Sequence, residues 1–171
     1  MKTFEVNGNL PQENYSTFLE DINKVYSIFS SHFGENIMKK IDLFVDNATG
    51  NSTGYTPMAI PVLQKYIIIK LGLNNFEDSA RTIYQFSHEL CHYVFYSIKG
   101  IDKPLADAKE ESICSAMSLI IVRELSPISF GRYFDYVSKL ENESWRKGAE
   151  IAKSINFDII KLVAIIFDEC R

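Results

Sequence analysis

The amino-acid sequence predicts an α+β domain in which a small mixed sheet of about three strands packs on a mainly helical core. Apolar residues recur at the helical spacing of three and four over residues 12–33, and again over most of the chain after residue 74. Between these regions, residues 41–71 alternate or cluster as strand residues do. No repeat, linker or low-complexity tract divides the 171 residues, so we expect one domain over residues 1–171.

The first elements are an extended lead-in and a long amphipathic helix. Residues 1–11 end at a proline and read as extended chain, and the helix follows over residues 12–33. Gly34 is placed to end that helix as a C-cap. Its apolar face comprises Tyr15, Phe18, Leu19, Ile22, Val25, Tyr26 and Phe29.

Three strand-like segments follow the first helix. Residues 41–46 alternate apolar and other side chains, which predicts a strand with one buried face, and the polar run 47–56 predicts a loop. Residues 58–62 form a short strand, which Pro57 and Pro61 confine to an edge or an irregular segment. The run 66–71 is rich in β-branched residues and is the strongest strand signal in the chain.

The remainder of the chain reads as helices. Residues 74–98 form a helix that is apolar on more than one side, which implies deep burial, and Gly100 closes it. A second strong helix covers residues 106–125 and ends before Pro127. Further helical patterns cover residues 130–140, 144–155 and 158–170.

Composition excludes several classes of protein. The net charge of −4 argues against nucleic-acid binding, which needs a basic surface. The longest apolar stretch, residues 159–167, contains Lys161 and is far shorter than the roughly 20 residues of a membrane span. The N-terminus has no signal-peptide pattern, and three cysteines without close pairing indicate reduced thiols. We therefore expect a soluble cytoplasmic protein; the sequence carries no signal for its oligomeric state.

The candidate site lies at residues 88–92, His88-Glu89-Leu90-Cys91-His92. Residues four apart lie on one helical face with Cβ atoms about 5–6 Å apart, so His88 and His92 can share a zinc ion. The glutamate between them is placed to take a proton from a metal-activated water. Buried structural thiols are the favoured interpretation of Cys91 and Cys114.

A catalytic zinc usually takes three protein ligands. A third histidine six residues after His92 would define one class of zinc peptidase, but that residue is Ile98 and no histidine follows. The third ligand must then be an acid or a cysteine. Glu110 and Glu111, at the start of the next helix, are the candidates; we favour Glu111, because its helix face carries small side chains that allow close helix packing, and keep Glu110 as the alternative.

The two-helix pattern resembles the gluzincins, in which a helix bearing the two histidines is followed by an antiparallel helix that supplies a glutamate ligand. The resemblance covers roughly residues 62–125 and is nearest to small intracellular peptidases of the ImmA/IrrE type and to the minigluzincins. It implies a zincin-like core with additional C-terminal helices, one Zn²⁺ per chain and a peptide or protein substrate.

The resemblance also implies roles for further residues. Ser115 stands where many gluzincins carry an acidic or amide residue that orients a histidine. Tyr133 and Tyr136 are candidates to stabilise the oxyanion, with a role as core aromatic residues as the alternative. The edge strand that binds substrate in extended form would be the strand of residues 66–71, with Tyr66, Ile67, Ile68, Ile69 and Lys70 as its contact residues.

The sequence thus predicts a zinc-dependent peptidase in which His88, His92 and Glu111 bind the metal and Glu89 acts as general base and acid. Two alternatives stay open. A zincin scaffold without catalysis would act as a binding or regulatory module. A metal-free helical interaction protein would carry the motif by accident.

Overall fold

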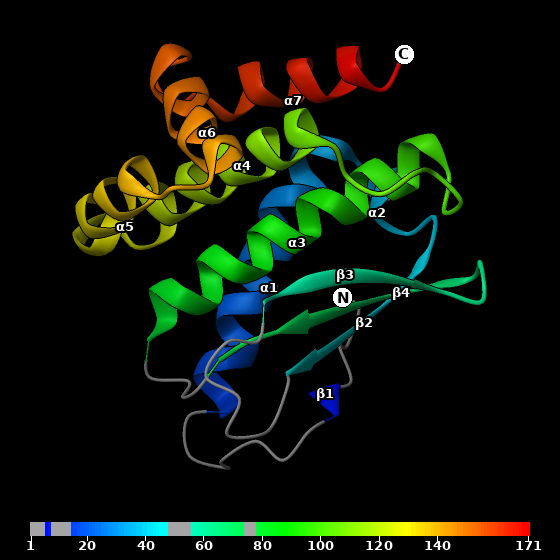
Figure 1. The fold of residues 1–171 in the computed structure, drawn as a ribbon. Helices are drawn as coiled ribbons and strands as arrows, with labels where there is room; N and C mark the ends of the chain where they lie inside the picture. Colours follow the sequence, from blue (N-terminus) through cyan, green and yellow to red (C-terminus); the bar gives the residue numbers. More distant parts are fainter. Residues whose placement is uncertain (1–5, 8–14, 48–55, 74–77) are drawn as a thin grey trace.

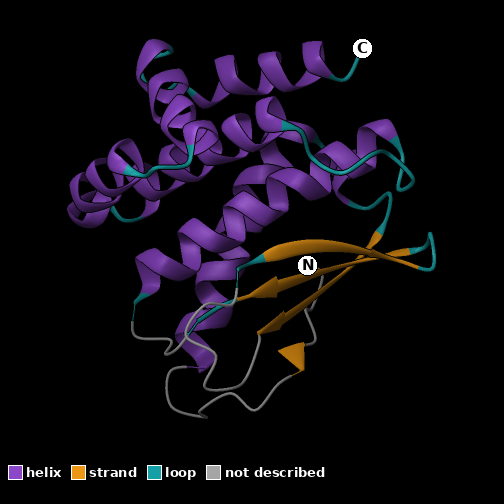
Figure 2. Cartoon of the chain, in the orientation of Figure 1, coloured by secondary structure: helices purple, strands orange, loops and turns teal. Residues whose placement is uncertain are grey.

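The computed structural model describes residues 6–7, 15–47, 56–73 and 78–171. The predicted α+β class is confirmed: helices dominate, and a small mixed sheet lies beside them (Figures 1 and 2). The predicted loop over residues 47–56 lies largely outside the described residues, as does most of the N-terminal lead-in. Helix α3 lies between the sheet and the C-terminal helices in Figure 1, so it contacts both halves of the fold.

The predicted first helix is present as α1, Tyr15–Phe33, with a buried face that includes Phe18, Ile22 and Phe29. Gly34 follows it with φ +79°, a left-handed conformation that side chains other than glycine rarely adopt. A one-turn helix that the sequence did not predict, α2, spans Glu35–Met38. Its last carbonyl, of Met38, accepts hydrogen bonds from the Tyr26 and Tyr93 hydroxyls, so α2 joins α1 to α3.

The sheet has the strand order β1-β2-β4-β3. Strands β1 (Val6–Asn7), β2 (Asp42–Asn47) and β4 (Tyr66–Leu71) are parallel neighbours, and β3 (Met58–Val62) pairs antiparallel with β4. The predicted alternation of β2 is confirmed, since Leu43 and Val45 are buried while Asp42 and Phe44 are exposed.

The expected edge position of the 66–71 strand is wrong. Strand β4 pairs on both sides, with β2 and with β3, so its backbone is already bonded and cannot pair with a substrate. The edge beside α3 is β3, the segment that Pro57 and Pro61 had confined to an edge. A hairpin connects β3 to β4 through Leu63 and Gln64, both with positive φ.

Helix α3, Ser79–Lys99, is the buried centre of the molecule. Every residue from 85 to 97 is buried, which confirms the deep burial predicted from its apolar residues. The helix begins later than expected: Asp78 is the N-cap, and its side chain accepts a hydrogen bond from the Arg81 backbone N–H. Gly100 closes the helix with φ +110°.

The C-terminal half consists of four helices: α4 (Ala108–Leu125), α5 (Pro127–Lys139), α6 (Glu143–Ser154) and α7 (Ile159–Glu169). Pro127 ends one helix and occupies the first turn of the next, where its missing N–H costs nothing. Helix α4 packs on α3 on one side and on α6 on the other.

The contact between α4 and α6 is very close. A Cβ placed on Gly148 of α6 would lie 2.5 Å from the Ser115 Cβ and 2.7 Å from the Ser112 carbonyl oxygen. Ser115 therefore faces α6, so part of the small-residue face of α4 serves this contact rather than the contact with α3.

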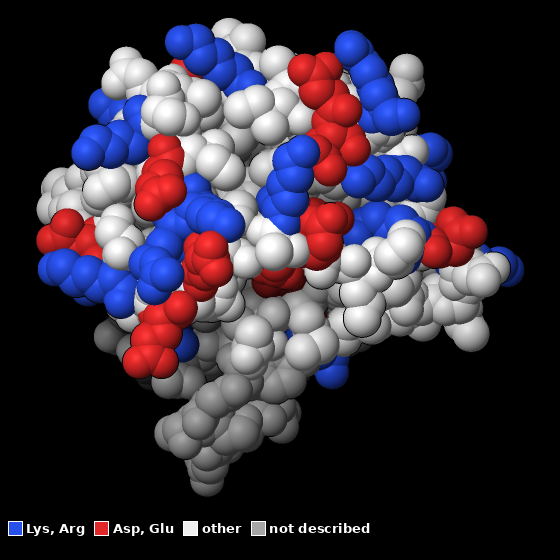
Figure 3. Space-filling model, turned by 45° about the horizontal axis from the view of Figure 1, so that its top comes forward, with Lys and Arg blue, Asp and Glu red and all other residues white. Residues whose placement is uncertain are grey.

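None of the described helices combines the length and apolar character that a membrane crossing requires. On the face of the molecule drawn in Figure 3, basic and acidic side chains are interspersed.

Candidate metal centre

Helix α3 presents His88, Glu89 and His92 to one pocket. The two imidazole rings, one helical turn apart, have centroids 5.0 Å apart. Their exposed fractions are 8% and 7%, which means that both rings reach the pocket from an otherwise buried helix.

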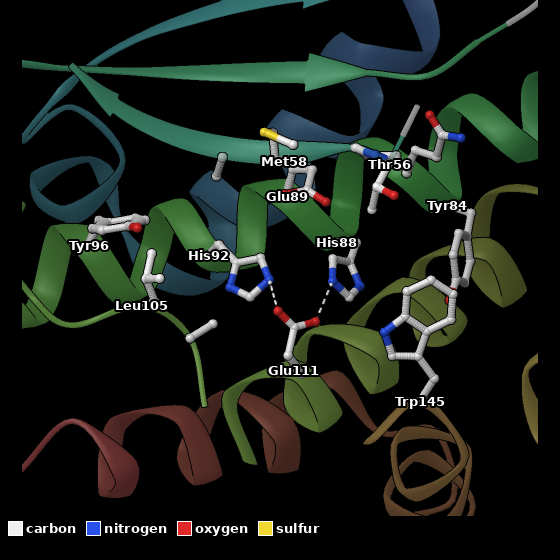
Figure 4. Close-up of a pocket in the computed structure, with 14 residues that line it drawn as sticks. Thr56, Met58, Tyr84, His88, Glu89, His92, Tyr96, Leu105, Glu111 and Trp145 are labelled. Atoms are coloured by element: carbon white, nitrogen blue, oxygen red, sulfur yellow. Dashed lines mark hydrogen bonds and ion pairs between the residues drawn. The ribbon is translucent and has the colours of Figure 1, made fainter. Parts of the chain in front are cut away.

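Glu111 approaches the histidines from the first turn of α4. One carboxylate oxygen lies 3.3 Å from His88 Nε2 and the other lies 3.4 Å from His92 Nε2, as Figure 4 shows. The three candidate ligand atoms all lie within 4.8 Å of one another. Asp107 fixes the start of α4, because its side chain accepts hydrogen bonds from the backbone N–H groups of Lys109 and Glu110.

Glu110 lies on the other side of the His92 ring. Its carboxylate is 2.8 Å from His92 Nδ1 and 2.9 Å from Lys103 Nζ. The lysine side chain is only 3% exposed and lies over the Tyr96 ring, with Nζ 4.4 Å from the ring centroid. Because Nδ1 donates to Glu110, Nε2 is the nitrogen left for a metal. Glu110 and Lys103 thus orient His92.

In the metal-free protein this cluster behaves as a set of ion pairs. Burial opposes protonation of His92, but hydrogen bonds to Glu110 and Glu111 raise its pKa to about 10. Burial raises the pKa of Glu111, yet its hydrogen bonds to His88 and His92 lower that pKa well below its usual range. A positive imidazole is therefore held between two carboxylates.

Glu89 is in a different environment from the other two glutamates. Burial raises the pKa of its carboxyl group, and the neighbouring imidazoles and a hydrogen bond from the Ala59 backbone oppose that shift without cancelling it. A carboxyl group with a raised pKa accepts and releases protons closer to neutral pH.

The nearby cysteines are buried, as the sequence predicted. Cys114 Sγ lies 3.5 Å from His92 Nδ1, on the side of the ring that faces Glu110. Burial, followed by interactions with Cys91, raises the pKa of Cys114 well above its ordinary value. The thiol lies beside Nδ1 of the ring rather than beside Nε2, the nitrogen left for a metal.

The pocket above these side chains has a volume of about 270 Å³. Its walls come from the edge strand β3, helix α3, the connection before α4 and the start of α6 (Figure 4). Residues that line it besides the candidate ligands and Glu89 are Thr56, Pro57, Met58, Ala59, Tyr84, Gln85, Tyr96, Leu105, Ala106 and Trp145.

Three expectations about surrounding residues disagree with the structure. Ser115 was expected to orient a histidine, but among the described residues no hydrogen bond joins its hydroxyl to either ring, and Glu110 holds His92 instead. Tyr133 and Tyr136, expected near the oxyanion, do not line this pocket. Their helix, α5, lies beyond Tyr84, whose ring stacks on Tyr133 with centroids 5.3 Å apart.

The sequence did not indicate two residues of the site. Trp145, whose ring lies 6.2 Å from that of His88, is the single tryptophan of the chain, and that rarity was a usable signal. Nothing in the sequence distinguishes Lys103 from the other lysines, since its importance comes from burial against α3 and α4.

The arrangement could hold a metal ion: two imidazole nitrogens and one carboxylate oxygen converge, and His92 is held through its other nitrogen. This donor set is one that zinc takes in catalytic sites. No protein-family model, curated protein or solved structure matches the chain.

Proposed function

We propose that the chain is a zinc-dependent peptidase that binds one zinc ion through His88, His92 and Glu111. The observation that carries the proposal is the convergence of these three side chains on a pocket that also contains Glu89. Zinc, when bound, supplies Lewis-acid activation of water and of a carbonyl group.

Glu89 is the proton carrier of the proposed reaction. Its carboxylate accepts a proton from the attacking water and returns that proton to the leaving amine, which is general base and then general acid catalysis. The raised pKa of this buried carboxyl suits both transfers. Glu110 and Lys103 keep the His92 ring in place during the reaction.

The pocket suits an extended substrate. It lies between β3 and α3 on one side and α6 on the other, so a chain lying along the edge strand passes over Glu89 and the candidate ligands. Edge strands bind peptides in this way. We assign this role to β3 in place of β4.

The test combines zinc content with peptide cleavage. Purified protein should bind about one zinc per chain, and His88→Ala and Glu111→Gln should lose most of it. Glu110→Gln should keep a zinc site of lower affinity, and Glu124→Gln, which changes an exposed glutamate of the same helix, should match the wild type. Zinc is measured by mass spectrometry after gel filtration.

Cleavage of casein or a peptide pool should require zinc, and Glu89→Gln should reduce it by a factor of about 10²–10⁴ while zinc content stays unchanged. Zinc binding without Glu89-dependent cleavage would instead favour a silent zincin scaffold. Absence of zinc, with thermal stability unaffected by chelator, would favour a metal-free protein in which Glu111 and the histidines only form ion pairs.

A further inference from the structure

A second groove continues from the metal pocket on the side of His88. We call it the aromatic groove; its volume is about 540 Å³. It shares Thr56, Pro57, Tyr84, Gln85 and Trp145 with the metal pocket, so the two are continuous. Its remaining lining residues are Asp78, Arg81, Arg132, Tyr133 and Tyr136.

Four aromatic side chains from three helices form the groove. Tyr84 of α3 and Tyr133 of α5 stack with an interplanar angle of 27°, and Trp145 of α6 lies edge-on to His88. Tyr136 is 56% exposed, so one wall presents a ring that a bound molecule can cover. In Figure 4, Tyr84 and Trp145 lie beside each other next to His88, at the entrance to this groove.

The two arginines of the groove already have partners. Arg132 lies 3.4 Å from the Asp78 carboxylate and 5.2 Å from the centre of the Tyr133 ring. Arg81 donates a hydrogen bond to the Gly72 carbonyl. The two arginines are therefore less available to bind an acidic group than the exposed rings are to contact an apolar group.

The edge strand offers a substrate few backbone donors. The Ala59 backbone N–H donates a hydrogen bond to Glu89, so this N–H points away from β4. Because backbone direction alternates along a strand, the nitrogens of Pro57 and Pro61 point outward in the same way. Prolines have no N–H. From residue 57 to residue 61 the outer edge can therefore accept hydrogen bonds but has no free donor, and side-chain contacts must supply much of the affinity for substrate.

We propose that the aromatic groove binds an aromatic side chain of the substrate, on a residue close to the bond that is cleaved, and that this contact makes the enzyme selective for peptides with such a residue. The inference rests on the zinc peptidase proposed above. The groove begins one helical turn from His88, which places a bound ring near the reacting bond.

The experiment compares zinc-binding probes that differ in one side chain. The hydroxamates of N-acetylated phenylalanine, alanine and glutamate carry the same metal-binding group, and their binding to the zinc-loaded protein is followed by the fluorescence of Trp145, the single tryptophan. The phenylalanine probe should bind about 10-fold or more tightly than the alanine probe, because its ring is removed from water.

Two variants of the groove should reduce this preference. Tyr136→Ala and Tyr133→Ala should each lower the ratio of the two affinities by about 2- to 10-fold, the usual range for an aromatic pair. Tyr136 is largely exposed, so its variant should fold normally. The matched control is Phe44→Ala, which removes a partly exposed ring from the sheet, away from both pockets.

Each alternative result overturns the proposal in a recognisable way. Equal binding of the phenylalanine and alanine probes would show that the groove takes no side chain. Tightest binding of the glutamate probe would assign the groove to Arg81 and Arg132 and to acidic substrates. A direct zinc titration of the same preparation that showed no zinc site would refute the peptidase itself, and the groove's role with it.

Discussion

The two sides of the proposed cleft are built differently. On the α3–α4 side, the charged side chains around the His92 ring are buried and paired, as in the chain from His92 to Glu110 to Lys103. On the α5–α6 side, rings such as Tyr136 remain open to solvent. A buried ion pair holds one geometry because any displacement leaves a charge unpaired, whereas an exposed ring adapts to what it contacts.

This difference assigns separate tasks to the two sides. Metal binding and proton transfer need atoms fixed within a fraction of an ångström, and the α3–α4 side provides such fixed positions. Recognition of a side chain needs apolar area and some freedom, and the α5–α6 side provides these. Substitutions should therefore affect zinc affinity and stability on the first side and substrate preference on the second.

The largest stability effect should come from Lys103→Met. It leaves the buried Glu110 carboxylate with His92 as its one remaining partner in the site, and breaking a buried ion pair in this way costs up to about 3–5 kcal/mol of unfolding free energy. Zinc affinity should fall about 10- to 100-fold, as happens when a residue that orients a ligand is disturbed. Urea unfolding and zinc titration measure the two effects.

Two further variants test the origin of that loss. The double variant Lys103→Met/Glu110→Gln removes both charges and should recover most of the stability. Lys109→Met removes an exposed lysine that pairs with Glu169, and it should lower the unfolding free energy far less than Lys103→Met does. If Lys103→Met lowered the unfolding free energy as little as Lys109→Met does, the buried ion pair would not hold the α3–α4 side rigid.

The junction of the two sides is at Gly148, and Gly148→Ala should have an intermediate effect. The added methyl group would overlap Ser115 and the Ser112 carbonyl, so α6 must move away from α4 at a cost of about 1–3 kcal/mol. Trp145 lies one turn before this residue and should move with the helix.

We therefore expect a changed Trp145 emission spectrum together with a lower melting temperature, while zinc affinity stays within a few-fold of the wild type. Ala149→Gly, at the next position, is a control that adds no atoms. A large loss of zinc binding in Gly148→Ala would contradict the division between the two sides, because α6 contributes none of the candidate ligands.

Local geometry explains what the sequence predicted well. Helical periods and strand alternation depend on near neighbours, and the i, i+4 spacing places His88 and His92 on one face of a helix wherever that helix lies. Helix α4 returns along α3, and this places one of the two glutamates of its first turn near the histidines. Glu111 lies there, and its role as a ligand stays a prediction.

Long-range packing explains what the sequence did not predict. The order of strands depends on pairing between distant segments, so the strongest strand signal, residues 66–71, marked the centre of the sheet rather than its edge. The small side chains of α4 favour Glu111 as the ligand only if Ser115 faces α3, but Gly148 brings α6 onto Ser115. The sequence indicates Glu110 only as a ligand, because the buried lysine that pairs with it lies in a connection without a recognisable pattern.

The last prediction concerns pH. In metal-free protein the pKa of His92 is raised from an ordinary 6.5 to about 10, so the folded state holds a proton that the unfolded state releases. The stability due to this residue is complete below pH 6.5 and is lost as pH rises toward 10. Zinc reverses the sign, because its binding requires a neutral His92: stability of the zinc-loaded protein should rise with pH up to about 6.5 and show no His92-dependent loss above it.

Urea unfolding between about pH 5 and pH 10, in chelator and in excess zinc, measures how the unfolding free energy of each form changes with pH. A His92→Asn variant measured in chelator gives the contribution of all other titrating groups, and subtracting it isolates this residue. If the unfolding free energy of the metal-free wild type changed with pH just as that of His92→Asn does, Glu110 and Glu111 would not hold a charged imidazole between them. The side chains of the α3–α4 side would then take up their fixed positions only when the metal binds, and not before.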